Sequence, residues 1–205
     1  QYLLDNAQQL KADFSDLAIY PVCADISESF GLPEEVRAMH KLGFFPGSSI
    51  GNFTPKEATV FLQRLRATLG AGAQLLIGVD AKKSVSVLEA AYNDSAGVTA
   101  AFNLNALQHL NEHLGANFKL EQFAHEARYN VELGCIQMFL RSRVAQQVEI
   151  SGSVLEFTAG EVIHTEDSYK YQPEEFLFLA QDAGFSKTAL WQDADAWYSL
   201  FLMHT

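Results

Sequence analysis

The sequence has little of what membrane, secreted and nucleic-acid-binding proteins need. It contains no run of about 18 apolar residues, so we expect no membrane-spanning helix. The first residues are polar and helical in pattern, so we expect no signal peptide. Lysine and arginine together number 14 against 25 acidic residues, which gives a net charge of −11. A chain this acidic lacks the basic face that nucleic-acid binding requires.

Cysteine is also scarce. The two cysteines, Cys23 and Cys135, lie far apart in the sequence, each in an apolar stretch typical of a strand. Two distant thiols do not make the disulfide framework of a small secreted domain. We therefore predict two buried free thiols and a cytoplasmic protein.

Apolar residues are plentiful, and their spacing predicts an α/β fold. Hydrophobic residues make up 48% of the chain, enough for a substantial core. Continuous apolar strands alternate with amphipathic helices, which favours a parallel sheet covered on both faces. The expected strands are 17–23, 42–46, 74–79, 188–191 and 197–203, and the expected helices are 2–13, 55–69 and 173–183.

The middle of the chain has a different pattern. Two helices are expected first, followed by segments in which apolar and polar residues alternate as in half-buried antiparallel strands. The expected helices are 84–92 and 98–114, and the expected strands are 128–132, 135–144, 148–150 and 154–157. We therefore divide the chain into a partial core at 1–83, an inserted domain at 84–170 and a return to the core at 171–205.

The stretch F-F-P-G-S-S-I-G-N-F-T-P at 44–55 joins a strand to a helix. Gly47 and Gly51 allow a sharp turn and a close approach to a ligand, and Asn52 can donate and accept hydrogen bonds. Thr54 and Glu57 predict a capping box at the start of the helix. Open α/β sheets bind ligands at such strand ends, but a tight connection without a ligand would use the same residues.

Several polar residues outside that loop have a structural and a functional interpretation. Asp25 and Asp80 each follow an expected strand, where a carboxylate either caps a turn or contacts a nucleotide-like ligand. The hydroxyl of Tyr92 can point into a cleft or lie at the edge of the core. For each of these residues alone, the structural interpretation is the commoner one.

The pattern H-x-x-E-H at 109–113 matches the inverted zinc-peptidase motif. His109 and His113 share one helix face, and Glu112 would act as the base of a zinc hydrolase. Such a site needs a third protein ligand. The apolar face of this helix is carried by leucines at 107, 110 and 114, so a polar, solvent-facing surface explains the same residues, and we favour that interpretation.

The stretch I-H-T-E-D-S-Y-K-Y at 163–171 holds polar groups at alternate positions. If it is extended, Glu166, Ser168 and Lys170 point to one side. A carboxylate and a hydroxyl two residues apart suit a small heteroaromatic donor such as imidazole. An exposed edge strand with paired charges would look the same.

Three longer motifs occur in order: F-P-G-S-S-I-G-N at 45–52, A-Y-N-D-S-A-G-V-T-A-A-F-N at 91–103 and T-E-D-S-Y-K at 165–170. Together they resemble the SAM-dependent histidine-specific methyltransferases, the family of the histidine Nα-trimethyltransferase of ergothioneine biosynthesis. The resemblance implies a class I, Rossmann-like SAM methyltransferase core with an inserted α+β substrate-binding domain. It also implies transfer of methyl groups from S-adenosylmethionine (SAM) to the α-amino nitrogen of L-histidine, up to the trimethylated product hercynine.

The same resemblance implies roles for single residues. Asp25 and Ile26 match the pair that contacts the adenine of SAM. Gly47 and Asn52 match loop residues around the α-amino and carboxylate groups of the amino acid. Tyr92 matches a tyrosine that grips the carboxylate. The residues that match the imidazole pocket are Met138, Glu166 and Ser168. The reaction requires no covalent nucleophile, and no metal ligand is implied.

Two parts of the family pattern have no counterpart in this sequence. The glycine-rich SAM loop follows the family's first core strand, whereas the first glycine here is Gly31. The acidic residue that meets the ribose is also missing. We therefore expect a core that is incomplete at the N-terminus. Two alternatives stay open: a methyltransferase of the same fold acting on another amino acid or amine, and a remnant that binds an amino acid without SAM.

Overall fold

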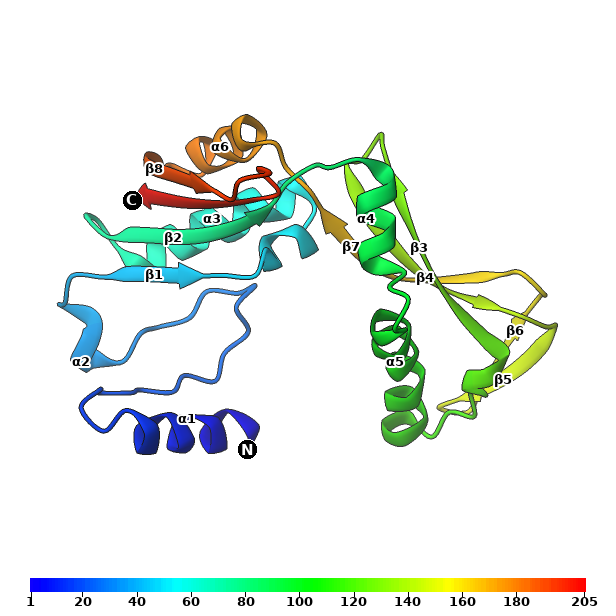
Figure 1. Ribbon diagram of the computed structural model, residues 1–205. Coiled ribbons are helices and arrows are strands. Elements are labelled where there is room, and N and C mark those ends of the chain that lie inside the picture. The colour runs from blue at the N-terminus through cyan, green and yellow to red at the C-terminus, as the bar shows by residue number, and fades with distance from the viewer.

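The computed structural model describes residues 1–205, and its main sheet has four strands (Figure 1). The strand order is β1-β2-β9-β8, with bounds of Leu42–Phe45, Gln74–Asp80, Tyr198–His204 and Ser186–Gln192. Only β1 and β2 are parallel, because β9 runs antiparallel to both β2 and β8. The prediction of a parallel sheet is therefore wrong for the C-terminal strands. The connection between β8 and β9 is too short for the crossover that parallel strands need.

Two helices, α3 (Pro55–Leu69) and α6 (Pro173–Asp182), cover one face of this sheet. The predicted capping box at the start of α3 is present, since Thr54 and Glu57 bond each other's backbone amide groups. Phe61 of α3 and Phe176 of α6 lie in one core with alternate residues of β2 and β9. The hydrophobic face of each helix therefore holds it against the sheet.

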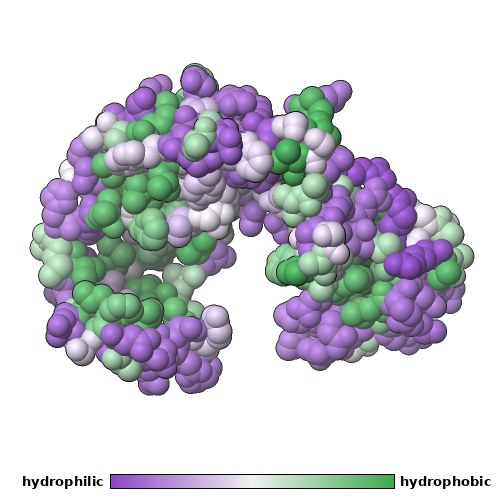
Figure 2. Space-filling view, viewed as in Figure 1, coloured by the Kyte–Doolittle hydropathy of each residue, from purple (hydrophilic) through white to green (hydrophobic).

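The opposite face of the sheet is open, so the prediction of helices on both faces is wrong. Leu42 and Phe44 of β1 are 59% and 64% exposed. The N-terminal helix α1 (Tyr2–Asp13) lies away from the sheet and buries only Ala7. Apolar residues line the hollow between this N-terminal segment and the sheet (Figure 2).

The segment after α1 differs from its prediction. Residues 17–23 form no strand, because no strand pairs with them: β1, their nearest strand in sequence, bonds only to β2. A short helix, α2 (Glu34–Arg37), follows. Cys23 is consequently exposed, against the prediction, whereas Cys135 is buried and its pKa is raised by burial to about 11. Both thiols are free, as predicted.

A second sheet has the antiparallel order β3-β4-β7, with bounds of Phe123–Asn130, Cys135–Ser142 and Val162–Tyr169. The helices α4 (Val85–Tyr92) and α5 (Val98–Leu114) pack against it, and β5 (Gln146–Ile150) and β6 (Ser153–Phe157) form a separate hairpin. Short 3-10 helices lie at η1 (Ser49–Asn52) and η2 (Leu120–Gln122). The domain boundaries at 83/84 and 170/171 stay a prediction. No helix in the structure is both long and apolar enough to cross a membrane.

Candidate active site

The loop after β1 meets β7 at the junction of the two sheets. Gly47 and Ser48 have positive φ angles of 76° and 58°, which turn the chain sharply before η1. Gly51 then packs directly on β7, because a Cβ atom at this position would lie 2.6 Å from the backbone oxygen of Tyr169. Glycine is therefore required here by close packing of η1 against β7.

A cavity of about 310 Å³ lies at this junction. Its walls come from the loop after β1, the ends of β2 and α4, and one side of β7 with Lys170 just beyond it. The lining residues are Gly47, Ser48, Ser49, Asn52, Asp80, Tyr92, Glu166, Ser168, Lys170 and Tyr198. The structure thus brings together seven residues that the sequence singled out in different segments: Gly47, Asn52, Asp80, Tyr92, Glu166, Ser168 and Lys170.

Three lining residues form a hydrogen-bonded cluster around Lys170. This lysine is only 2% exposed, and its ammonium group donates to the hydroxyls of Tyr92 and Ser168 at 2.7 and 2.8 Å. Asp80 holds the same ammonium group at 3.1 Å. The alternation in 163–171 predicted that Lys170 shares a side with Glu166 and Ser168. Its burial and its partners on α4 and β2 come from the tertiary fold and have no local sequence signal.

Tyr198 is a further lining residue that the sequence did not single out. Its hydroxyl accepts a hydrogen bond from the backbone N–H of Gly47 at 3.0 Å. The phenol ring lies over Gly78 of the neighbouring strand, where any side chain would collide with it. The glycine inside an otherwise apolar strand is the one sequence feature that could have indicated this close approach.

Glu166 lies in the cavity without a hydrogen-bond partner for its carboxylate in the structure. Burial raises the pKa of this carboxyl, and the nearby Lys170 ammonium opposes that effect. Met138 faces Glu166 across the β4–β7 pair and is 2% exposed, but it belongs to the core beneath the cavity and does not line it.

Asp25 and Ile26 lie outside this cavity. Asp25 occupies a turn, in which its carboxylate accepts from the backbone N–H and the hydroxyl of Ser27 at 2.8 and 2.6 Å. The hydroxyl bond is the larger cause that lowers the pKa of Asp25. Arg64 of α3 donates to the backbone oxygen of Ser27, so the turn is anchored beside a second cavity of about 350 Å³. Contrary to prediction, Asp25 does not follow a strand.

The residues of the possible zinc motif do not form a metal site. The rings of His109 and His113 pack edge to face, with their centroids 5.7 Å apart. Glu112 accepts a hydrogen bond from Gln108 on the same helix. No group of three or more histidine, cysteine or acidic side chains in the structure is placed to hold a metal ion. The zinc hydrolase alternative therefore has no third ligand.

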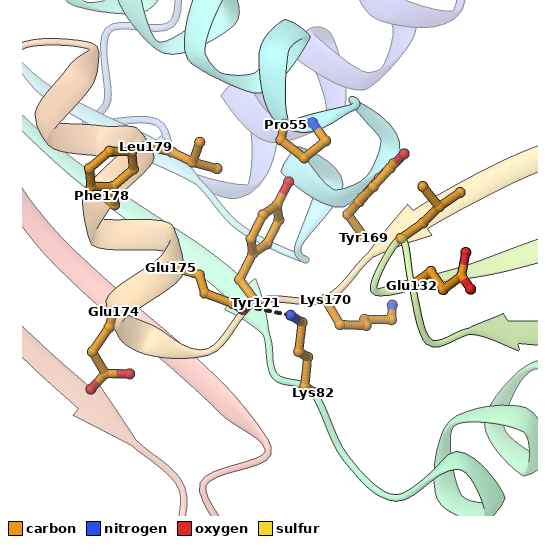
Figure 3. A pocket seen from close by; sticks show the side chains of 11 residues that line it. Pro55, Lys82, Glu132, Tyr169, Lys170, Tyr171, Glu174, Glu175, Phe178 and Leu179 are labelled. Carbon is orange, nitrogen blue, oxygen red and sulfur yellow. Dashed lines mark hydrogen bonds and ion pairs between the residues drawn. The ribbon is translucent and has the colours of Figure 1, made fainter.

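The largest cavity, about 590 Å³, lies on the other side of β7 (Figure 3). Tyr169 and Tyr171 point into it beside Pro55 and Leu179. Glu166 and Ser168 line the smaller cavity instead, on the opposite side of the strand. The hydroxyl of Tyr171 is buried without a hydrogen-bond partner. None of the residues matched to SAM or histidine lines this cavity.

The sheet and its helices have the fold of class I SAM-dependent methyltransferases. The CcbJ methyltransferase from Streptomyces caelestis superposes with a TM-score of 0.53 at 12% identity, covering 99% of this chain and 75% of that one. This likeness shows the fold alone.

The family follows from the sequence comparison. The model of the family described as "Histidine-specific methyltransferase, SAM-dependent" matches residues 1–205, and the chain belongs to this family. It is 41% identical over 194 residues to the histidine N-alpha-methyltransferase of Mycolicibacterium smegmatis, covering 93% of this chain and 60% of that protein. It is 36% identical over 199 residues to the enzyme of the same name from Mycobacterium tuberculosis, covering 96% and 61%. The chain thus spans about three fifths of the length of these relatives.

Proposed function

We propose that this protein transfers methyl groups from SAM to the α-amino nitrogen of L-histidine, up to trimethylation. The observation that carries the proposal is the cavity in which Tyr92, Glu166 and Ser168 converge with the loop at Gly47–Asn52. Family membership and the similarity to two histidine N-alpha-methyltransferases support the same substrate.

The cavity has the chemistry that an amino acid with an imidazole side chain needs. Glu166 offers an unpartnered carboxylate and Ser168 a hydroxyl on one side. On the other side, Asn52 and the polar loop at 47–49 are available to the α-amino and carboxylate groups, whereas the Tyr92 hydroxyl is bonded to Lys170 and Ser168. A wrong side chain would leave buried polar groups unpaired, which is the strongest source of selectivity in such sites.

The turn at Asp25 fits the adenine end of SAM. Its carboxylate can accept from an exocyclic amine, and the side chain of Ile26 is 50% exposed for contact with a ring. When bound, SAM supplies an activated methyl group on a positively charged sulfur. The turn does not line the cavity proposed to bind histidine. The loop at 47–52, which does line that cavity, comes directly after β1, the first strand after the turn. We propose that Asp25 and Ile26 hold SAM.

The residues of this chain act by positioning. The cavity holds no cysteine, and the buried Cys135 has a raised pKa that keeps its thiol protonated at neutral pH. Gly47 and Asn52 would hold the accepting nitrogen in line with the methyl group, which is catalysis by orientation. The two free cysteines, one of them exposed, support a reducing compartment, and we propose the cytoplasm.

Calorimetry with L-histidine, with and without SAM, tests this function. Glu166→Ala and Ser168→Ala are each expected to weaken histidine binding about 10- to 100-fold, because each removes a buried hydrogen bond. Glu149→Ala and Ser153→Ala make the same changes on exposed residues of the β5–β6 hairpin and serve as controls. Unchanged histidine binding in both cavity variants, or tighter binding of another amino acid or amine by the unaltered protein, would overturn the histidine assignment.

A further inference from the structure

The Lys170 ammonium group is held inside the cavity wall by two hydrogen bonds and an ion pair. It has three N–H bonds and three oxygen neighbours: the Tyr92 hydroxyl at 2.7 Å, the Ser168 hydroxyl at 2.8 Å and the Asp80 carboxylate at 3.1 Å. An ammonium group has no lone pair, so both hydroxyl oxygens must accept from it, and the Asp80 carboxylate balances its charge. The side chain is 1% exposed and cannot exchange these partners for water. The directions of the two hydrogen bonds to Tyr92 and Ser168 are therefore fixed.

This arrangement also fixes the direction of the next hydrogen bond. Tyr92 and Ser168 are joined hydroxyl to hydroxyl at 2.9 Å, with Tyr92 as the donor. The phenol is the more acidic of the two groups, and the ammonium 4.7 Å from the ring centroid further favours its donation. The Ser168 oxygen thus accepts two hydrogen bonds, one from Lys170 and one from Tyr92. Both of its lone pairs are occupied, and only its own O–H is left for a ligand.

The cavity therefore offers a ligand ring one donor and one acceptor. Ser168 can only donate, and the ionised carboxylate of Glu166 two residues earlier can only accept. A neutral imidazole has one N–H and one bare nitrogen, which match this pair. An imidazolium has two N–H groups, so one of them would face the Ser168 O–H and the positive charge of Lys170. An indole has an N–H but no bare nitrogen, so it would leave the Ser168 donor unpaired.

We infer that Lys170 is a positioning residue that fixes Ser168 as a hydrogen-bond donor and thereby selects the neutral imidazole ring, with its N–H toward Glu166. The inference rests on the proposed function and adds to it the protonation state of the bound side chain. The titratable groups that share the cavity with Lys170 are Asp80 from β2, Tyr92 from α4, Glu166 from β7 and Tyr198 from β9. Asp80 also pairs with Lys83, so it keeps a cation when Lys170 is replaced.

Nitrogen NMR of bound ¹⁵N-labelled L-histidine tests the inference directly, because protonated and bare ring nitrogens have separate chemical shifts. The spectrum is recorded at about pH 6.5, where free histidine is half protonated. With the unaltered protein, one protonated and one bare ring nitrogen are expected. In Lys170→Met, the bound ring is expected to become a mixture of neutral and protonated forms, with about tenfold weaker binding.

Two further variants separate this role from a general effect on folding or charge. Lys83→Met removes the other ammonium on Asp80 and makes the same charge change, but Lys83 does not line the cavity, so the nitrogen spectrum is expected to stay as in the unaltered protein. Tyr92→Phe keeps Lys170 and frees one lone pair of Ser168, so the protonated fraction of bound histidine is expected to rise. The Tyr92 variant gives an answer even if Lys170→Met fails to fold.

The outcomes distinguish failure of the inference from failure of the proposed function. Histidine bound to the unaltered protein with both ring nitrogens protonated overturns the inference and leaves histidine binding intact. Spectra of Lys170→Met and Tyr92→Phe that match the unaltered protein overturn the role of Lys170. The absence of any bound histidine overturns the proposed function itself, and the inference falls with it.

Discussion

Burial raises the pKa of Glu166, and the ionised side chain therefore lowers the stability of the ligand-free protein. A raised pKa means that the folded protein holds the proton more tightly than the unfolded chain. The stabilising effect of that proton is present below the unfolded value of about 4.3 and is lost as the pH rises through the folded value. At pH 7 the carboxylate is therefore ionised at a partly buried position, where desolvation of its charge destabilises the folded state.

Glu166→Gln is accordingly expected to make the ligand-free protein more stable at pH 7. The variant should lose this advantage below about pH 4, where the glutamate of the unaltered protein is protonated and uncharged like the glutamine. Urea unfolding at the two pH values measures the difference. Glu149→Gln, on an exposed residue of β5, is the control and is expected to change stability little at either pH. A Glu166→Gln variant that is less stable than the unaltered protein at pH 7 would contradict the argument.

Gly51 lies where η1 packs directly on β7. Gly51→Ala is expected to destabilise the protein by about 1–3 kcal/mol, because the new Cβ atom would lie 2.6 Å from a backbone oxygen that has no flexible end to move. Histidine binding should weaken as well, since η1 and β7 both line the cavity. Chemical denaturation and calorimetry measure the two effects. Gly31→Ala, where the nearest atom is 3.8 Å away, is the matched control and should change neither.

Among the elements, α6 shows most clearly how a helix is held to the sheet. Phe176 is fully buried and packs on Phe201 with 4.9 Å between ring centroids, whereas Phe178 on the same helix is 71% exposed. Phe176→Ala is expected to cost about 3–5 kcal/mol of unfolding free energy, from lost burial and the cavity left behind. Phe178→Ala should cost less than about 0.5 kcal/mol. Equal losses in the two variants, measured by urea unfolding, would show that α6 is not anchored through Phe176.

At the scale of the whole molecule, the candidate site lies where the two sheets meet, and Cys135 and Tyr169 of the second sheet also pack in the core of the first. The ammonium of Lys170 and the backbone N–H of Tyr171, at the end of β7, both bond Asp80 at the end of β2. A ligand in the cavity would contact the loop after β1 from the first sheet and β7 with α4 from the second. Binding is therefore expected to order both sides together.

Hydrogen exchange measured by mass spectrometry, with and without saturating L-histidine, tests this coupling. Exchange is expected to slow in η1, α4 and β7, because a bound ligand suppresses the local opening of the segments that it contacts. The β5–β6 hairpin takes no part in the cavity and provides an internal reference. Slowing confined to α4 and β7 would show that the ligand engages only the second sheet.

Local features of the sequence were sufficient to predict the bounds of several helices. The helices at 55–69 and 98–114 have the predicted bounds, because capping residues and apolar spacing act within a few turns of the chain. The prediction failed at 17–23, where an apolar stretch finds no partner strand, and at the C-terminus, where β9 inserts between β2 and β8 in the antiparallel direction. Strand pairing depends on residues far apart in the sequence, which local patterns do not encode.

Some features of the candidate site likewise follow from local sequence, and others depend on the tertiary structure. By itself, the sequence determined the family and the residue types available for chemistry, since motifs such as T-E-D-S-Y-K place Glu166, Ser168 and Lys170 on one side of a strand. Only the tertiary structure decided that the Lys170 ammonium is buried against Tyr92 and Asp80. A hydrogen bond acquires its direction and its strength from burial and from all its partners at once, and these are brought together only when the two sheets meet.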